Sequence, residues 1–164
     1  MPLARDIVAT YLGPKRVMQR LTAMGRREDL ALIFLMIFCF FTFISQLPKL
    51  VRQSHISGED LSVLMAGTLM ASVILLPLLF YFLAAIVQLT WLGLGKKCTG
   101  YHSRLALFWS LLATTPVILL YGLLAGLLGP SYTVTVVGIF WFALFCCFWI
   151  LTFGVSGEKR HDVN

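Results

Sequence analysis

The sequence predicts an all-α integral membrane protein: four transmembrane helices in a compact bundle, preceded by an N-terminal amphipathic interfacial helix. Three observations lead to this prediction. The 164 residues are 59% hydrophobic and only 12% charged, the charges gather in four short stretches, and the runs between them are rich in Leu and Phe. Such continuous runs differ from the strands of a membrane barrel, which alternate in polarity. Because one helical span needs about 20 apolar residues, four spans account for most of the chain.

The predicted organisation has three parts: a cytoplasmic basic arm (residues 1–27), a transmembrane domain (28–155) and a cytoplasmic tail (156–164). The four spans lie at about residues 29–47, 61–94, 105–128 and 132–155. The second run is too long for one straight span and too short for two. Pro77 near its centre removes a backbone donor, so we expect one tilted, kinked helix; two re-entrant halves are the alternative. Pro116 is a second candidate kink, near the middle of the third span.

The distribution of basic residues predicts the orientation. Lys and Arg accumulate on the cytoplasmic side of membrane proteins. With both termini inside, eleven of the thirteen Lys and Arg residues fall on the cytoplasmic side and only Lys49 and Arg52 fall on the other. We therefore expect a multi-pass protein of the cell inner membrane. The N-terminal segment lacks the apolar core of a signal peptide, so we expect it to persist.

The N-terminal arm is expected to form one or two helices on the inner membrane surface. Gly13-Pro14 interrupts the apolar face of Ile7, Val8, Tyr11 and Leu12. A second apolar face then follows at helical spacing, made by Val17, Met18, Leu21 and Met24. The candidate lipid-facing residues of the arm are Lys15, Arg16 and Arg20. Each basic residue near an anionic leaflet contributes about 1 kcal/mol of attraction, so anionic lipid is the expected partner. An anchor that sets orientation is favoured over a membrane-sensing or partner-binding arm.

The ends of the spans carry several local signals. Span one is expected to end at Gln46-Leu47-Pro48, with an outer loop at residues 49–58 in which Ser57 could cap the next helix. In span three, Gly122 and Gly126 are four residues apart, a spacing that lets two helix backbones approach closely in lipid. Trp91 and Trp109 flank the inner loop, where indoles favour the membrane interface.

Apart from Asp29 at the very start of the first span, no predicted span contains Asp, Glu, Lys, Arg or His, which argues against a pump, an ion pathway or an intramembrane enzyme. Ser72, Thr114 and Thr115 are expected to bond to their own helix backbones. Cys98 and His102 share the inner loop, but two ligands fall short of the four that a structural zinc site needs. We therefore expect no catalytic residue, no cofactor, no metal and no nucleic-acid partner.

A series of short segments resembles the bacterial branch of the Yip family, small multi-span membrane proteins named for interaction with Ypt/Rab GTPases. The segments are, in order, Gly13-Pro14, Arg27-Glu28-Asp29, Gln46-Leu47-Pro48 with Arg52, Pro77-Leu78-Leu79-Phe80-Tyr81, Arg104-Leu105-Ala106-Leu107-Phe108-Trp109 and Gly129-Pro130. The resemblance implies a cytoplasmic N-terminus and a helical bundle. Tyr11-Leu12-Gly13-Pro14 matches the eukaryotic segment only loosely, and eukaryotic members usually have five spans, so GTPase binding is not transferred.

The leading functional hypothesis is a non-enzymatic membrane scaffold, assembly factor or accessory subunit that acts through lipid and helix–helix contacts, with other membrane proteins or further copies of itself as partners. The alternative is a channel or transporter for a neutral or apolar solute, lined by Gln88, Ser72, Thr68, Thr114 and Thr115. The best candidate polar cluster, at the inner surface, comprises Arg27, Glu28, Asp29 and Arg104.

Overall fold

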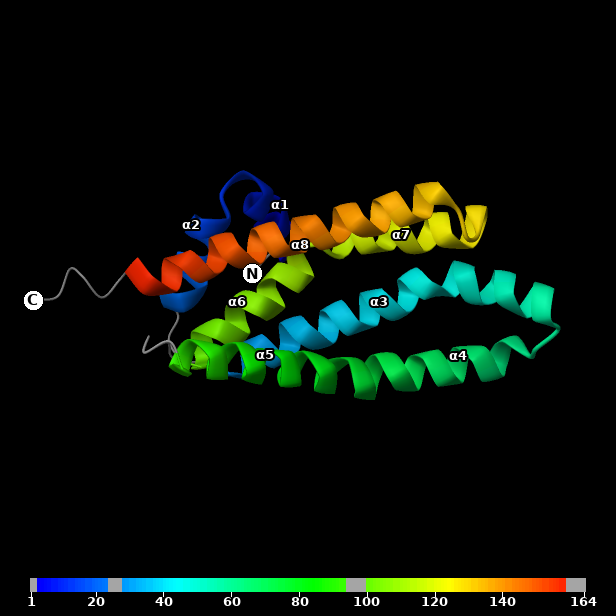
Figure 1. Cartoon of the computed structure of the whole chain (residues 1–164), viewed down its shortest axis with the longest axis horizontal. Helices are drawn as coiled ribbons and strands as arrows, with labels where there is room; N and C mark the ends of the chain where they lie inside the picture. The colour runs from blue at the N-terminus through cyan, green and yellow to red at the C-terminus, as the bar shows by residue number, and fades with distance from the viewer. Residues whose placement is uncertain (1–2, 24–27, 94–99, 159–164) are drawn as a thin grey trace, which may run out of the picture.

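The computed structural model describes residues 3–23, 28–93 and 100–158, and within these ranges every regular element is a helix (Figure 1). The elements are α1 (Leu3–Leu12), α2 (Pro14–Ala23), α3 (Glu28–Ser57), α4 (Leu61–Met70), the π-helical segment η1 (Ala71–Leu75), α5 (Leu76–Gly93), α6 (Gly100–Ala113), α7 (Thr115–Leu128) and α8 (Tyr132–Glu158). The predicted all-α class is confirmed.

Three helices are long and apolar enough to cross a membrane: Asp29–Ser57, Leu61–Thr90 and Tyr132–Thr152. A fourth crossing exists if Ser103–Ala113 and Thr115–Leu128, which meet at an angle of 47°, form one bent span. The second predicted run is therefore one continuous helix rather than two re-entrant halves. These helices make the chain a membrane protein.

Contacts between residues of neighbouring helices show the directions of the helices. Ser45, Pro48 and Arg52 of α3 meet Gly122, Gly126 and Gly129 in the same order, so α3 and α7 run parallel. Helix α8 runs the other way, because Tyr121 lies against Gly138 whereas Ser110, earlier in the chain, lies against Thr152. In Figure 1 the α4–η1–α5 helix lies on one side of α3, and α7 and α8 lie on the other.

Helix α6 is the centre of the core. Every residue from Leu105 to Thr115 is buried, and Trp109 has no exposed surface. The helix is enclosed by α1, α3, α5 and α8, with Phe34 and Tyr81 packed edge-on against Trp109 and Phe108. The expectation that Trp109 sits at the membrane interface is therefore wrong, because four other helices surround it.

The predicted end of the first span at Pro48 is also wrong as a helix boundary, since α3 continues to Ser57. Proline lacks the N–H that a helix interior uses and crowds the preceding turn, yet the helix continues through it. The ring of Pro48 packs closely on Gly126 of α7, where a side chain would overlap it. The outer loop is reduced to residues 58–60, beginning at Gly58, whose φ of 72° suits glycine.

The cap of the following helix is Asp60 rather than Ser57. The Asp60 carboxylate accepts hydrogen bonds from the Ser62 backbone N–H (3.0 Å) and hydroxyl (2.9 Å). Because α3 extends so far, the Ser57 hydroxyl instead donates to the Gln53 carbonyl of its own helix. The two accepted hydrogen bonds lower the pKa of Asp60.

Candidate functional site

The predicted polar cluster is only partly visible. Arg27 lies outside the described residues, as does the side chain of Glu28. Asp29 is exposed near the start of α3, and Arg104 is half-buried near the start of α6. Asp29 lies five residues before Phe34, and Arg104 lies five residues before Trp109. The rings of Phe34 and Trp109 are 5.0 Å apart. The two charged residues therefore lie at a similar level on neighbouring helices.

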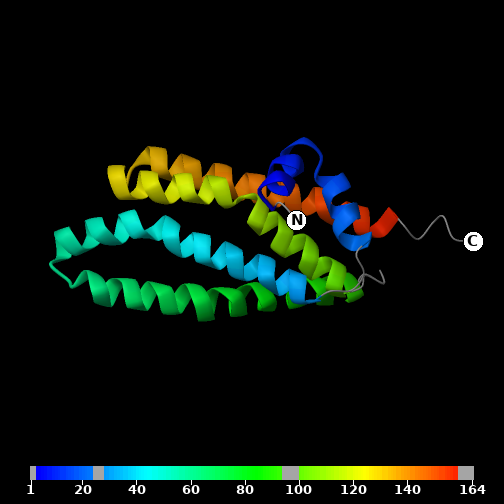
Figure 2. The ribbon, with the colours of Figure 1, turned by 180° about the vertical axis from the view of Figure 1, so that it is seen from behind.

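The predicted basic residues of the arm lie on the outside of α2. Arg16 and Arg20 are exposed, whereas Val17 and Met18 are buried against the bundle; the side chain of Lys15 is outside the described part. Figures 1 and 2 show that α1 and α2 lie against one half of the bundle, and their contacts are with α6 and α8. The arm therefore covers the core as well as presenting cations outward.

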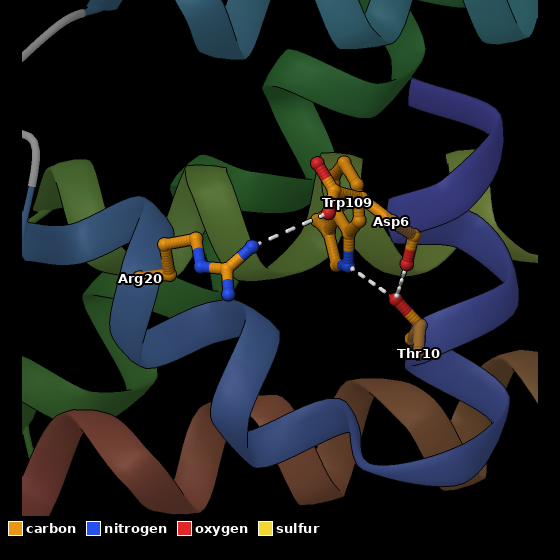
Figure 3. A network of polar contacts seen from close by, with 4 residues as sticks. All are labelled: Asp6, Thr10, Arg20 and Trp109. Carbon is orange, nitrogen blue, oxygen red and sulfur yellow. Dashed lines mark hydrogen bonds and ion pairs between the residues drawn. The ribbon is translucent and has the colours of Figure 1, made fainter. Parts of the chain in front are cut away.

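A short polar network connects the arm to the core (Figure 3). The Thr10 hydroxyl donates to the Asp6 carbonyl (2.7 Å) and accepts from the Trp109 indole N–H (3.2 Å). The Asp6 carboxylate, 13% exposed, lies 3.7 Å from the guanidinium of Arg20, which ties α1 to α2. A buried indole N–H needs a hydrogen-bond acceptor. Thr10 of the arm supplies that acceptor to Trp109 in the core of the bundle.

Tyr11 contacts the break between α6 and α7. Its hydroxyl donates to the Ala113 carbonyl at 3.0 Å, and its ring meets Phe148 of α8 edge-on. In a continuous helix the Ala113 carbonyl would accept the Val117 N–H, but that N–H bonds to Thr114 instead. The arm thus satisfies a carbonyl that the break leaves without a helical partner. Burial raises the pKa of the Tyr11 phenol.

Pro116 lies directly after this break, at the start of α7. The Thr114 hydroxyl bonds to the Leu111 carbonyl, as predicted. The Thr115 hydroxyl is buried and has no hydrogen-bond partner among the described residues, so the same prediction is wrong for Thr115. A proline near the first helical position needs no N–H donor there, which is why the chain turns here and starts a new helix.

Pro77 follows the π-helical segment rather than marking a sharp break. The backbone N–H of Leu76 donates to the Ala71 carbonyl, five residues back. This wider turn is a way to relieve the crowding between a proline ring and the turn before it. Beside the segment lies an apolar groove of about 640 Å³ between α3 and α5, lined by Gln46, Ala71, Ser72, Leu75, Leu76, Leu78, Leu79 and Phe82.

Two polar side chains stand in this groove. Ser72 is 3% exposed and Gln46 is half-buried, and neither side chain forms a hydrogen bond with another described residue. Gln46 follows Ser45, which packs against Gly122, two turns below the end of α7. The backbone of Gln46 therefore lies roughly 8 Å inside the end of that helix, at 1.5 Å per residue, within the apolar part of the molecule.

The predicted small-residue contact does occur. A Cβ added at Gly122 would overlap the Ser45 carbonyl, and one added at Gly126 would overlap Pro48. Both glycines lie on the face of α7 that meets α3, as the four-residue spacing predicted. This contact fixes α7 against the first span.

The proposed solute-pathway residues do not come together. Ser72 faces the groove beside α3, Thr114 and Thr115 are buried at the α6–α7 break, and Gln88 is exposed on α5. Within the described ranges no group of three His, Cys, Asp or Glu residues could hold a metal ion. Cys98 and the side chain of His102 lie outside the described part of the chain.

Searches against protein-family models, curated proteins and solved structures found no match. The resemblance to the Yip family therefore stands on the short segments alone. The structure itself supports a membrane protein that is helical throughout its described elements, with three continuous helices and one bent pair that are long and apolar enough to cross a membrane.

Proposed function

We propose that this protein is a non-enzymatic membrane scaffold or accessory subunit that binds a transmembrane helix of another membrane protein, or of a second copy, in the groove between α3 and α5. We further propose the predicted topology, with four spans and both termini in the cytoplasm, and an arm held at the inner leaflet by anionic lipid. Of these features, the resemblance to bacterial Yip proteins implies the cytoplasmic N-terminus and the helical bundle; the basic residues and the apolar runs of the sequence suggest the others.

The observation that carries the proposal is the pair of polar side chains in the groove. An amide left without a hydrogen bond in an apolar medium costs roughly 2–7 kcal/mol, depending on the reference state. Side chains of this type stabilise helix association in lipid when a neighbouring helix supplies the partner. Gln46 and Ser72 would find such a partner on a helix seated in the groove.

The topology is supported by the parallel directions of α3 and α7. If α6 and α7 form one span, consecutive spans alternate in direction, and α3 then starts at the end of the bundle where α8 finishes (Figure 1). That end carries the exposed cations Arg16 and Arg20 of the arm. The excess of basic residues at this end of the bundle favours its placement on the cytoplasmic side of the membrane.

The test is co-purification from the native membrane in nanodiscs, followed by mass spectrometry of the bound proteins. The variant Gln46→Leu removes the groove amide at similar volume, and Gln88→Leu is its matched control, because Gln88 is exposed on α5 away from the groove. We expect a stoichiometric partner, or a dimer, that is lost in Gln46→Leu and retained in Gln88→Leu. Equal recovery of the partner with both variants would contradict helix binding in the groove. Recovery of a monomer alone would contradict a scaffold function.

A further inference from the structure

A second cleft lies at the opposite end of the bundle from the arm. It encloses about 330 Å³ and is lined by Lys49, Arg52, Gln53, Ile56 and Ser57 of α3, by Tyr121 and Ala125 of α7, and by Gly129, Pro130 and Val134 around the turn into α8. The cleft contains two cations and three polar side chains above an apolar floor. It shares no residue with the groove proposed to bind a helix.

Arg52 is held in this cleft by the end of α7. Its guanidinium donates to the carbonyls of Leu127 (3.1 Å) and Gly126 (3.4 Å), both through Nη1. A cation at a helix C-terminus is favoured by the helix dipole, so part of the role of Arg52 is structural. The guanidinium has five N–H donors, and those on Nη2 and Nε are not used by described residues.

Lys49 has no such structural role. It is exposed one turn before Arg52, and its ammonium takes part in no hydrogen bond or ion pair with a described residue. Arg52 is likewise paired with no carboxylate among the described residues. Two neighbouring cations without a counter-charge form a site of positive potential that fits an anionic group.

The depth of the cleft identifies that anion. Arg52 is level with the turn between α7 and α8, where the spanning part of α8 begins at Tyr132. Figure 1 shows the α3–α4 hairpin projecting past this turn. A membrane boundary at the turn would place Lys49 and Arg52 among the phosphates of one leaflet, since the 21 residues Tyr132–Thr152 match the thickness of a bilayer core.

A second, apolar hollow adjoins the cleft at Tyr121, on the side towards the middle of the bundle, and we call it the furrow. Tyr121 lines the cleft and also a hollow of about 280 Å³ formed with Ile118, Gly138, Trp141 and Phe142. Val134, Gly138 and Trp141 succeed one another at helical spacing along α8, so the furrow follows the junction of α7 and α8. Its form suits an acyl chain descending from a headgroup at Lys49 and Arg52.

We propose that this cleft binds one anionic phospholipid of the leaflet opposite the arm, with its phosphate between Lys49 and Arg52 and an acyl chain in the furrow beside Tyr121. This site is independent of the helix-binding groove and of the attraction between the arm and the inner leaflet. Lys49 binds the phosphate directly, whereas Arg52 both binds it and holds α7.

The test maps the lipid on the full-length protein. Phosphatidylglycerol with a photoreactive group in the acyl chain is cross-linked to the protein in neutral detergent, and the adducts are located by peptide mass spectrometry. We expect adducts on α7 and α8 around Tyr121 and Trp141. In Lys49→Gln the half-saturating lipid concentration for these adducts should rise about fivefold, which corresponds to ~1 kcal/mol for one basic residue near anionic lipid.

Two variants and three competitors separate the alternatives. Lys49→Arg keeps the charge and should keep the wild-type concentration dependence, and Arg16→Gln removes an exposed cation from the arm and should leave these adducts unchanged. Unlabelled long-chain phosphatidylglycerol should compete, whereas phosphatidylcholine and inorganic phosphate should not. Adducts unaffected by Lys49→Gln would overturn the proposal, as would equal competition by phosphatidylcholine; competition by inorganic phosphate would show a soluble anion as the ligand instead.

Discussion

The contact between α3 and α7 gives the sharpest test of how this bundle is held together. Replacing Gly122 by Ala places a Cβ about 2.5 Å from the carbonyl carbon of Ser45, whereas ordinary contacts begin at 3.4 Å. The obstacle is backbone, so it cannot rotate away as a side chain would. The helices must separate along this contact, and overpacking of this kind typically costs about 1–3 kcal/mol.

This steric cost is opposed by the higher helix propensity of alanine, which exceeds that of glycine by about 0.8–1 kcal/mol in soluble hosts. Gly67→Ala measures this term in the same protein, because Gly67 is an exposed helical residue of α4 with nothing within 4 Å of the added Cβ. We expect Gly67→Ala to be neutral or mildly stabilising and Gly122→Ala to be destabilised relative to it by at least ~1 kcal/mol. Gly126→Ala, with a Cβ 2.7 Å from the carbonyl carbon of Pro48, should behave like Gly122→Ala.

The assay is reversible unfolding in mixed micelles of a mild detergent and sodium dodecyl sulfate, followed by circular dichroism and tryptophan fluorescence. The midpoint fraction of dodecyl sulfate should fall in Gly122→Ala and Gly126→Ala but not in Gly67→Ala. If all three variants unfolded at one midpoint, α3 and α7 would not be in the close contact described, and the argument from steric overlap would fail.

Three further predictions concern the arm and the α4 cap. Thr10→Val should leave the Trp109 indole N–H without an acceptor and weaken docking of α1 by about 1–3 kcal/mol, measured as faster amide exchange in α1; Thr10→Ser, which keeps the hydroxyl, should exchange more slowly than Thr10→Val. Burial raises the pKa of Tyr11 above 10.0 when the arm packs on the bundle, so this packing should be favoured below pH 10.0 and lost as pH rises through the raised pKa. Ultraviolet titration of the phenol checks this, and Tyr11→Phe should abolish the pH dependence. The pKa of Asp60 is lowered, so its cap stabilises α4 above the ordinary carboxyl pKa and is lost as pH falls through the lowered value; amide exchange at Ser62 should accelerate in acid, and in Asp60→Ala at neutral pH.

Much of the fold could be predicted from local sequence because lipid imposes a simple rule. A span must satisfy its backbone hydrogen bonds internally and present apolar side chains to the bilayer, so long runs without charge identify helices. The spacing of Gly122 and Gly126 likewise predicts a close helix contact. It does not indicate that α3 is the partner, because many helix faces could accept a small-residue surface.

The errors arose where a local signal was overridden by a distant segment. Pro48 is a strong sign of a helix end, yet α3 passes through it and packs there against Gly126 of another helix. Trp109 is a tryptophan near one end of a predicted span, which is typical of an indole at the membrane interface. In the structure α1 covers it, and the Thr10 hydroxyl accepts its N–H. Neither contact can be found from spacing, since the residues involved are about 78 and 99 positions apart in the chain.

The sequence by itself therefore determined the helical, membrane-protein character of this chain, how many apolar runs it has and where its basic residues concentrate. Only the tertiary structure decided which helices touch, that the arm packs on α6 and α8, and that Gln46 and Ser72 share a groove while Lys49 and Arg52 share a cleft. The physical reason is that hydropathy depends on residues near one another in the chain. Grooves, clefts and the pairing of polar groups depend on the packing of segments far apart in it.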